Sequence, residues 1–370
     1  MQNSGMSYWE KELFGIEYDL IIIGGGLTGQ SVSYFYKKKH PDAKVLVLDR
    51  GFFPLGASTR NAGFACFGSI TEHIADMKLE SEAKIIDRIR RRFNGLNLLR
   101  ETLGDDNIQY EEPGSYEIFT DKKIYQEAVA HLEQVNRWLV EATGVENVYS
   151  SAEINGFPAI KIELEGCLHP GKMIKTLYHK NLNEGVEFRW ETHVVEIGKQ
   201  DGIIRLKNGV ELKSRQIIVA TNSFTSSLIK EVKINAGRGY VFITKAIPDL
   251  KWLGTFHYDR GYYYFRNIGK DRILLGGARS VDIEKETTTE FGVNHTIKNH
   301  LMEFATKILK LPQGWEIEQE WSGIMGFTKT KCPVLEKVGN RCYVVAGLSG
   351  MGVALGMQLG KEAAELLDNN

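Results

Sequence analysis

Three glycines near the start of the chain have the spacing that binds a nucleotide pyrophosphate. Gly24, Gly26 and Gly29 form the pattern G-x-G-x-x-G. The first glycine permits a tight turn, the second lets the backbone approach phosphates, and the third lets a helix pack closely on the preceding strand. The N-terminus of that helix offers N–H groups and a positive dipole end to an anion. The pattern predicts a dinucleotide site.

The elements that such a site needs surround these glycines. The apolar run Leu20–Ile23 predicts a buried parallel strand, Gln30–Lys39 predicts a helix, and Lys44–Leu48 predicts a second strand. Asp49 ends that strand about 20 residues past the loop, where a carboxylate can bind ribose hydroxyls. A glycine turn with only a structural role is the alternative, and the strand–helix–strand context with its acid favours the dinucleotide site.

Three more segments place small and polar residues at strand ends. The segment Gly56–Gly63 alternates small residues with hydroxyl, guanidinium and amide groups that could wrap a diphosphate. The segment Val219–Ser223 ends an apolar strand, and Val344–Ala354 joins a strand to a helix through glycines. Each has a plainer interpretation, namely a surface loop, a simple turn or a packing turn between a strand and a helix.

Strand–helix patterns occur at both ends and in the middle of the chain, with antiparallel strand patterns between them. Helical spacing of apolar residues predicts further helices after Ser81, over Lys122–Glu141, over His169–Glu184 and over Asn294–Leu309. This order predicts an α/β fold, α+β overall. A Rossmann-like domain would be interleaved with a second domain built on a mixed, largely antiparallel sheet.

Composition excludes several classes of function. The chain has 370 residues, 42% hydrophobic and 25% charged, with a net charge of −1, so it lacks the positive charge that nucleic-acid binding needs. Its four cysteines form no C-x-x-C pair and its nine histidines show no ligand spacing, so we expect reduced thiols and no metal site. The polar residues 1–12 contain no signal-peptide core, and no apolar run could span a bilayer, which predicts a cytoplasmic protein.

Taken in order, these motifs resemble the D-amino-acid oxidase superfamily of FAD-dependent oxidoreductases. The similarity is greatest to the glycine oxidase, sarcosine oxidase and gamma-glutamylputrescine oxidase branch, and it runs from about Tyr18 to the C-terminus. Other matching segments are Gly166–Pro170, Gly185–Phe188, Thr192–Ile197, Gly261–Arg266, Arg272–Gly277 and Trp321–Thr328.

The resemblance implies non-covalently bound FAD and a set of residues around it. These are Gly24, Gly26, Gly29, Asp49, Arg50, Ser58, Thr59, Arg60, Asn61, Val194, Thr221, Gly347, Gly350 and Met351. It also implies a division of the chain between two domains. The FAD-binding domain would comprise residues 1–85, 150–225 and 325–370, and the substrate-binding domain residues 86–149 and 226–324.

The implied reaction is oxidation of the CH–N bond of a small amino acid or N-alkyl amine. A hydride passes to flavin N5, and the imine product is hydrolysed. An arginine suits a substrate carboxylate, so the candidates are Arg266 and Arg279, with Tyr263 as a hydroxyl donor and His257 as a weaker candidate. Strand alternation puts Tyr263 and Arg266 on opposite faces, so one regular strand cannot bring both into one pocket.

Two departures from the family concern oxygen and covalent attachment. In a gap-free register, Leu275 takes the place of a lysine that promotes reaction with oxygen, and Met325 takes that of a cysteine bonded to FAD. We therefore expect an electron acceptor that is either O₂, reacting slowly, or another oxidant. Cys332 could attach FAD only in a shifted register.

The alternative functions are a 2-hydroxy-acid dehydrogenase, a tRNA-modifying enzyme and a flavin-binding subunit of a larger complex. The sequence does not determine whether the chain forms a homo-oligomer.

Overall fold

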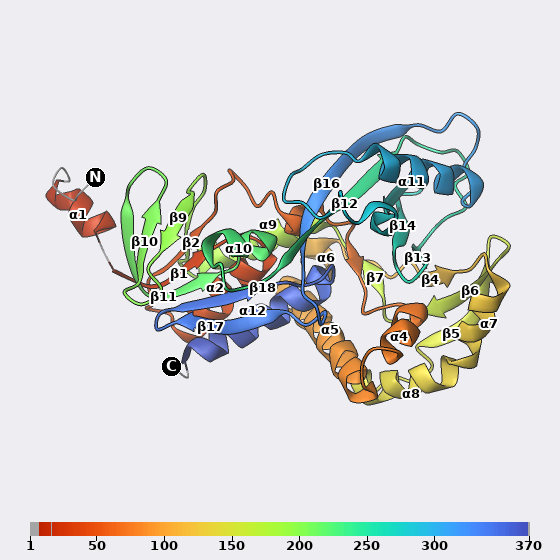
Figure 1. Ribbon diagram of the computed structural model, residues 1–370, viewed down its shortest axis with the longest axis horizontal. Coiled ribbons are helices and arrows are strands. Elements are labelled where there is room, and N and C mark those ends of the chain that lie inside the picture. The colour runs from red at the N-terminus through yellow and green to blue at the C-terminus, as the bar shows by residue number, and fades with distance from the viewer. Residues whose placement is uncertain (1–6, 16, 369–370) are drawn as a thin grey trace. The chain divides into compact units, whose positions relative to one another are not determined.

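The structure is a computed structural model that describes residues 7–15 and 17–368 (Figure 1). Its contacts divide the chain into two compact units. Unit 1 comprises Met1–Thr59, Gly171–Ala236 and Met325–Asn370, and unit 2 comprises Arg60–Pro170 and Gly237–Ile324. The boundaries of these units differ from those of the predicted FAD-binding and substrate-binding domains. The units are defined by contacts within the chain and not by ligands, so the predicted division by ligand stays a prediction. Part of the segment in which we expect no signal peptide, residues 1–6, lies outside the described residues.

Unit 1 is built on a parallel sheet. The order of its strands is β17 (Val334–Gly339), β18 (Cys342–Ala346), β11 (Glu211–Val219), β1 (Glu17–Ile23), β2 (Val45–Leu48) and β8 (Glu187–Arg189). The five strands from β18 to β8 run parallel, and β17 is antiparallel to β18. Two further strands, β9 (Val194–Ile197) and β10 (Ile203–Leu206), extend antiparallel from β11. Ile23 lies beside Val219 on one side and Leu48 on the other, so three strands end together.

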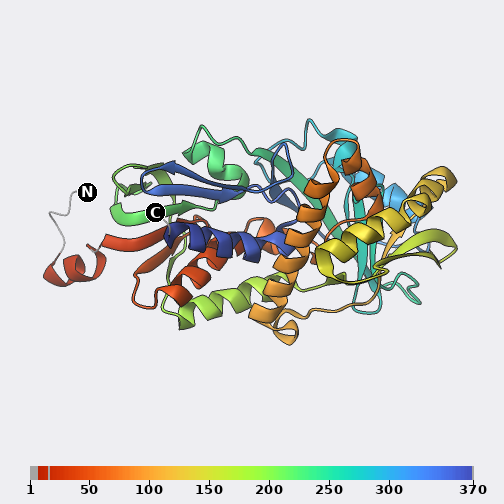
Figure 2. The same ribbon diagram turned by 90° about the horizontal axis from the view of Figure 1, so that it is seen from below.

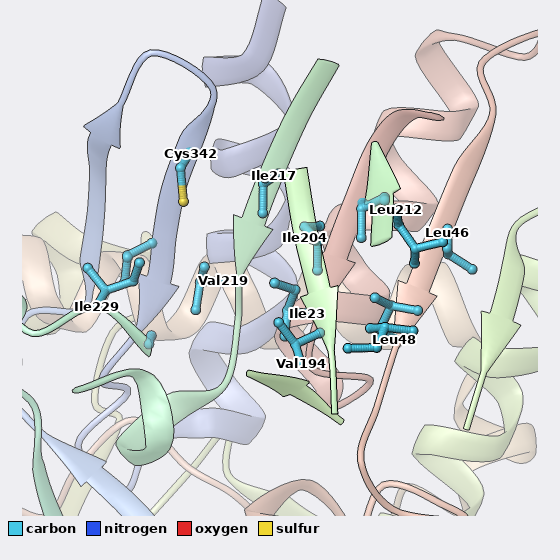
Figure 3. Packing of buried hydrophobic residues seen from close by; sticks show 14 of the residues in the cluster. Ile23, Leu46, Leu48, Val194, Ile204, Leu212, Ile217, Val219, Ile229 and Cys342 are labelled. Carbon is cyan, nitrogen blue, oxygen red and sulfur yellow. The ribbon is translucent and has the colours of Figure 1, made fainter. Parts of the chain in front are cut away.

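Apolar residues cover both faces of this sheet, because helices pack on one face, and the strands β9 and β10 pack on the other together with residues around Ile229. On the first face, Leu20 and Ile22 contact residues of α2 (Leu27–Lys39) and α12 (Gly352–Asp368). Figure 2 shows these helices on the same side as α9 (Pro170–Asn183). On the second face, the alternate residues Ile21 and Ile23 join a cluster with β9 and β10 (Figure 3). Full burial of each such side chain stabilises the fold by about 1.5–3 kcal/mol.

Unit 2 contains a mixed sheet of eight strands. Their order is β16 (Ile317–Phe327), β12 (Asn235–Thr244), β15 (Arg272–Gly277), β14 (Tyr263–Ile268), β13 (Thr255–Tyr258), β4 (Ser115–Ile118), β6 (Phe157–Ile162) and β5 (Tyr149–Ile154). Strands β13 and β4 pair in parallel, and the pairs on either side of them are antiparallel. The predicted mixed α/β fold is confirmed.

The two faces of the unit 2 sheet differ in chemistry. One face is apolar, and Phe256, Phe265 and Leu275 pack there with Phe304 of α11 (His295–Lys307). The other face carries polar residues such as His257 and Arg266. A second apolar cluster joins strand residues to four helices of this unit. They are α4 (Ile70–Met77), α5 (Glu82–Leu103), α7 (Lys122–Ala130) and α8 (Leu132–Thr143).

One local prediction, the single helix over 122–141, was wrong. The helix predicted over 122–141 breaks at His131, whose N–H bonds to the carbonyl of Ala128 three residues back and so ends α7. Ser81 is the residue that precedes α5, so the helix predicted after it is present. The apolar strand that ends at Val219 is the nine-residue strand β11.

The remaining elements are short. They are α1 (Tyr8–Phe14), α3 (Ala57–Arg60), β3 (Phe64–Ala65), α6 (Asp105–Ile108), β7 (Gly166–Cys167), η2 (Asn222–Phe224), α10 (Thr225–Leu228) and η3 (Arg279–Asp282). Among the described residues, no helix has both the length and the apolar character that crossing a bilayer would require. The four cysteines, all in the described part of the chain, form no disulfide.

Candidate functional site

The first candidate segment is the turn between β1 and α2. Gly24 has a φ of +111°, a conformation that side chains other than glycine rarely adopt. A Cβ atom on Gly29 would lie 1.9 Å from the carbonyl oxygen of Gly24, and one on Gly26 would lie 2.9 Å from Oγ of Ser58. The turn therefore requires bare backbone at each of the three glycines, as the sequence pattern predicts.

Asp49, at the end of β2, holds this turn. Its Oδ2 accepts a hydrogen bond from the N–H of Gly25 at 2.8 Å, and its Oδ1 accepts one from the N–H of Gly51 at 2.8 Å. Burial raises the pKa of Asp49, although these two N–H groups and the charge of Arg50 act to lower it. The carboxylate thus fixes the backbone beside Gly24 and lies at the edge of the sheet where β2 ends.

A second turn, between β18 and α12, begins at the same edge. Gly347 and Gly350 have φ values of +81° and +87°, and the N–H of Ser349 donates to the carbonyl of Gly326 at 2.9 Å. Helix α12 packs directly on α2. A Cβ atom on Gly356 would lie 2.6 Å from the side chain of Leu27, and one on Gly360 would lie 2.3 Å from that of Ser31. This register makes the two helices parallel, so their N-termini lie together.

The end of β11 completes the edge. The N–H of Ala220 donates to the carbonyl of Ile23 at 2.8 Å, which places Thr221 beside the glycine turn. The guanidinium of Arg50 lies 3.9 Å from the ring centroid of Phe224, just past β11. Val194 packs in the cluster that contains Ile23, near the ends of β1 and β2 (Figure 3).

This edge of unit 1 has the properties of an anion-binding site. Two helix N-termini and two glycine turns meet at the carboxyl ends of parallel strands. Open α/β sheets bind ligands outside the carboxyl ends of their strands. Helix N-termini there favour phosphate groups through their free N–H groups and their dipoles.

The predicted segment around Gly56–Gly63 spans the boundary between the units. In unit 1, Ser58 Oγ accepts a hydrogen bond from the N–H of Leu27 at 2.9 Å, and Thr59 Oγ1 donates to the carbonyl of Pro54 at 2.6 Å. In unit 2, Arg60 Nη1 donates to the carbonyl of Ser322 at 2.8 Å. Ser58 thus satisfies the first N–H of α2, a role that sequence reasoning did not foresee.

The predicted substrate residues belong to unit 2. Tyr263 lies on the apolar face, with its ring stacked on that of Phe304 at a centroid distance of 5.0 Å. Arg266 lies on the opposite face and is buried. Its Nε donates to the carbonyl of Ala62 at 2.8 Å, and its Nη2 donates to the carbonyl of Leu168 at 3.1 Å. The predicted alternation of faces is therefore present, and Arg266 already binds two backbone carbonyls.

Two other residues of this sheet bear on the sequence-based expectations. Arg279 follows β15 after Ala278, whose φ is +55°, and partial burial lowers the pKa of its guanidinium. Leu275 is fully buried among Phe242 and Phe265, so its side chain lies in the core of unit 2. That Leu275 takes the place of the family's lysine stays a prediction.

A buried polar cluster in unit 2 was missed. His257 Nε2 lies 3.2 Å from Oε2 of Glu165, and both side chains are buried. Glu165 was not a sequence-based candidate, because 92 residues separate it from His257. The Gly166–Pro170 motif that follows it was the nearest indication in the sequence.

Comparison with known proteins gives a family and several distant relatives. Residues 19–366 match the family described as FAD dependent oxidoreductase. A D-amino acid dehydrogenase of Helicobacter pylori is 20% identical, with 94% of each chain covered. A gamma-glutamylputrescine oxidoreductase of Escherichia coli is 23% identical, covering 95% of this chain and 84% of that one. The structure of a glycine oxidase from Geobacillus kaustophilus superposes with a TM-score of 0.74 at 19% identity, covering 96% of this chain and 95% of that one.

The chemistry of the unit 1 edge is consistent with FAD. The glycines of this turn keep bare backbone between β1 and the N-terminus of α2, which a close approach to a pyrophosphate requires. The carboxylate of Asp49 is held by N–H groups at the end of β2, where a ribose can donate hydroxyl hydrogen bonds. The residues that the structure places there therefore fit the cofactor of the family.

Proposed function

Since the chain belongs to the family of FAD-dependent oxidoreductases, we propose that it oxidises the CH–N bond of a small amino acid or an N-alkyl amine. The single observation that carries the proposal is the meeting of two glycine turns and Asp49 at one edge of the unit 1 sheet, in a chain that matches this family over 19–366. Two of the relatives bear names of enzymes that act on nitrogen compounds, a D-amino acid and gamma-glutamylputrescine.

Within this proposal, unit 1 holds FAD without a covalent bond. The turn at Gly24–Gly29 and the N-terminus of α2 bind the pyrophosphate, Asp49 binds the adenosine ribose, and backbone at Val194 contacts adenine. The turn at Gly347–Met351 and the N-terminus of α12 stabilise negative charge on the flavin by about 0.3–2 kcal/mol. When bound, FAD accepts the hydride that leaves the substrate carbon.

The residues of unit 2 orient the substrate. We place the carboxylate of an amino-acid substrate on Arg279 or on the remaining donors of Arg266, because a guanidinium has five N–H groups and binds both oxygens of a carboxylate. Tyr263 is the third candidate, but its ring packs on α11. Precise orientation and exclusion of water are what such a protein contributes to this reaction.

The test is anaerobic reduction of the flavin in the purified holoprotein. Separate samples receive glycine, sarcosine, D-amino acids, N-alkyl polyamine derivatives and 2-hydroxy acids, and absorbance of oxidised flavin is followed. We expect bleaching by at least one amine or amino acid and none by the matching 2-hydroxy acid. Bleaching by hydroxy acids alone, or by no compound on the panel, would overturn the proposal.

A further inference from the structure

We propose that unit 2 contains a binding site for one zinc ion, formed by Cys66, Glu165 and His257. One ligand atom from each residue lies within 4.8 Å of the other two. A thiolate sulfur, a carboxylate oxygen and an imidazole nitrogen are the three kinds of ligand that zinc takes in proteins. The proposal does not depend on the oxidation reaction, and none of its residues was proposed above to bind FAD.

Strand pairing fixes the first two ligands relative to one another. Strands β3 and β7 pair antiparallel, with Phe64 beside Cys167 and Ala65 beside Gly166. Continuing this register by one residue places Cys66 opposite Glu165. Both residues therefore leave the same end of a short ladder, which brings a thiol and a carboxylate together although they are far apart in sequence.

The third ligand comes from the polar face of the large sheet. His257 lies in the middle of β13, paired with Tyr264 on β14 and Glu117 on β4. Its Nε2 lies 3.2 Å from Glu165 Oε2. Two atoms bound to zinc at about 2.0 Å in a tetrahedron lie about 3.3 Å apart, so this pair already has the separation that the ion requires. A tetrahedral zinc site would place Sγ about 3.5 Å from each of these two atoms, and in the structure the three ligand atoms lie within 4.8 Å of one another.

Hydrogen bonds around Glu165 hold the site in place. Oε1 accepts from the N–H of Phe67 at 2.9 Å and from that of Gly68 at 3.3 Å, and Oε2 accepts from Ser115 Oγ at 2.9 Å. The carboxylate thus binds the two residues that follow Cys66 and fixes the segment carrying the thiol. Metal-ligating carboxylates commonly have such outer hydrogen bonds, which orient them toward the ion.

The charges and the access of the cluster allow a cation, because the buried guanidinium of Arg92 near Cys66 is itself paired with Glu72. A second carboxylate, Glu117, is buried on the strand beside His257, and the edge of the Phe64 ring covers the imidazole at a centroid distance of 5.4 Å. Cys66 is partly exposed, so an ion can enter on its side. Binding would release two protons to solvent or to the other ring nitrogen, one from the Cys66 thiol and one from Nε2 of His257, which donates to Glu165 in the metal-free protein, and a water molecule would take the fourth position. The ion would link three segments of unit 2.

The first test measures zinc in the FAD-loaded protein after incubation with zinc sulfate and dialysis against metal-free buffer. We expect about one zinc per chain, and at least about tenfold less in Cys66→Ala and in His257→Gln. Cys332→Ala is the matched control, since Cys332 is an exposed thiol outside the cluster, and it should retain the metal. Flavin absorbance reports on unit 1, so a circular dichroism spectrum equal to that of the wild type is required to show that unit 2 of each variant is folded.

X-ray absorption at the zinc edge gives a second readout that flavin colour does not obscure. We expect one sulfur at about 2.3 Å and nitrogen or oxygen ligands at about 2.0–2.2 Å. Absence of stoichiometric zinc in the wild-type protein, unchanged zinc in Cys66→Ala, or a spectrum without sulfur would overturn the proposal. Because these measurements need no turnover, they are independent of the outcome of the substrate screen.

Discussion

The carboxylate of Asp49 offers a graded test of the cofactor edge, because two backbone N–H groups depend on it. Hydrogen bonds to a charged acceptor contribute about 1.5–3 kcal/mol each. Asp49→Ala removes the acceptor for both Gly25 and Gly51. We therefore expect a loss of about 3–6 kcal/mol in the free energy of unfolding of the apoprotein. Asp49→Asn retains one acceptor oxygen and should lose about half as much.

The same two variants should weaken FAD binding in the same order, since the turn at Gly24–Gly29 loses its support and the ribose loses its acceptor. We expect Asp49→Ala to raise the dissociation constant of FAD by at least about tenfold, which corresponds to 1.4 kcal/mol. Urea denaturation of the apoprotein and titration of apoprotein with FAD give the two quantities. Asp42→Ala, at an exposed carboxylate, is the control. Equal stability and FAD affinity in wild type and Asp49→Ala would refute this reasoning.

Four other outcomes follow from the geometry. Gly29→Ala should abolish retention of flavin, because its Cβ would lie 1.9 Å from a carbonyl oxygen, whereas Gly56→Ala, with no atom within 4 Å, should retain it; equal flavin content would contradict this. Arg266→Met loses two charge-assisted bonds to backbone carbonyls, so the free energy of unfolding should fall by about 3–6 kcal/mol, and a change confined to KM would instead identify a substrate anchor. Tyr263→Phe keeps its packing on α11 and should change stability by less than about 0.5 kcal/mol and leave the rate of flavin reduction nearly unchanged; a large fall in that rate would make the hydroxyl a participant. Acid precipitation should release all the flavin, and yellow colour in the pellet would show a covalent bond.

Local patterns were read correctly where one short stretch determines the structure. The glycine turn, the strand before it and the helix after it follow from about 30 neighbouring residues whose spacing matches one supersecondary unit. The break at His131 was missed because apolar residues keep a helical spacing across it, so periodicity alone does not distinguish one helix from two. Helix α7 ends where the N–H of His131 bonds to the carbonyl of Ala128, three residues back, instead of the carbonyl four residues back.

The environment of side chains in unit 2 depends on chain segments that are distant in sequence. Arg266 was expected to bind a substrate carboxylate from its residue type, but its partners Ala62 and Leu168 come from other parts of the chain. The cluster of Cys66, Glu165 and His257 has no ligand spacing, because a short antiparallel ladder and a separate strand bring its members together. Ligand motifs in a sequence detect sites made by one segment and miss sites made by three.

The chain enters each unit more than once, and this has a consequence for biosynthesis. The parallel sheet of unit 1 joins β1 to β11 and β11 to β18 (Cys342–Ala346), so strands that are far apart in the chain lie side by side. A growing polypeptide cannot complete that sheet until Cys342–Ala346 has been synthesised, and until then the apolar strands made earlier lack a neighbour in the sheet. The need to pair such remote segments slows folding, and it leaves hydrophobic surface and unpaired strand edges exposed in folding intermediates. Chaperone demand during synthesis, and failure of C-terminally truncated fragments to stay in solution, are the expected signs.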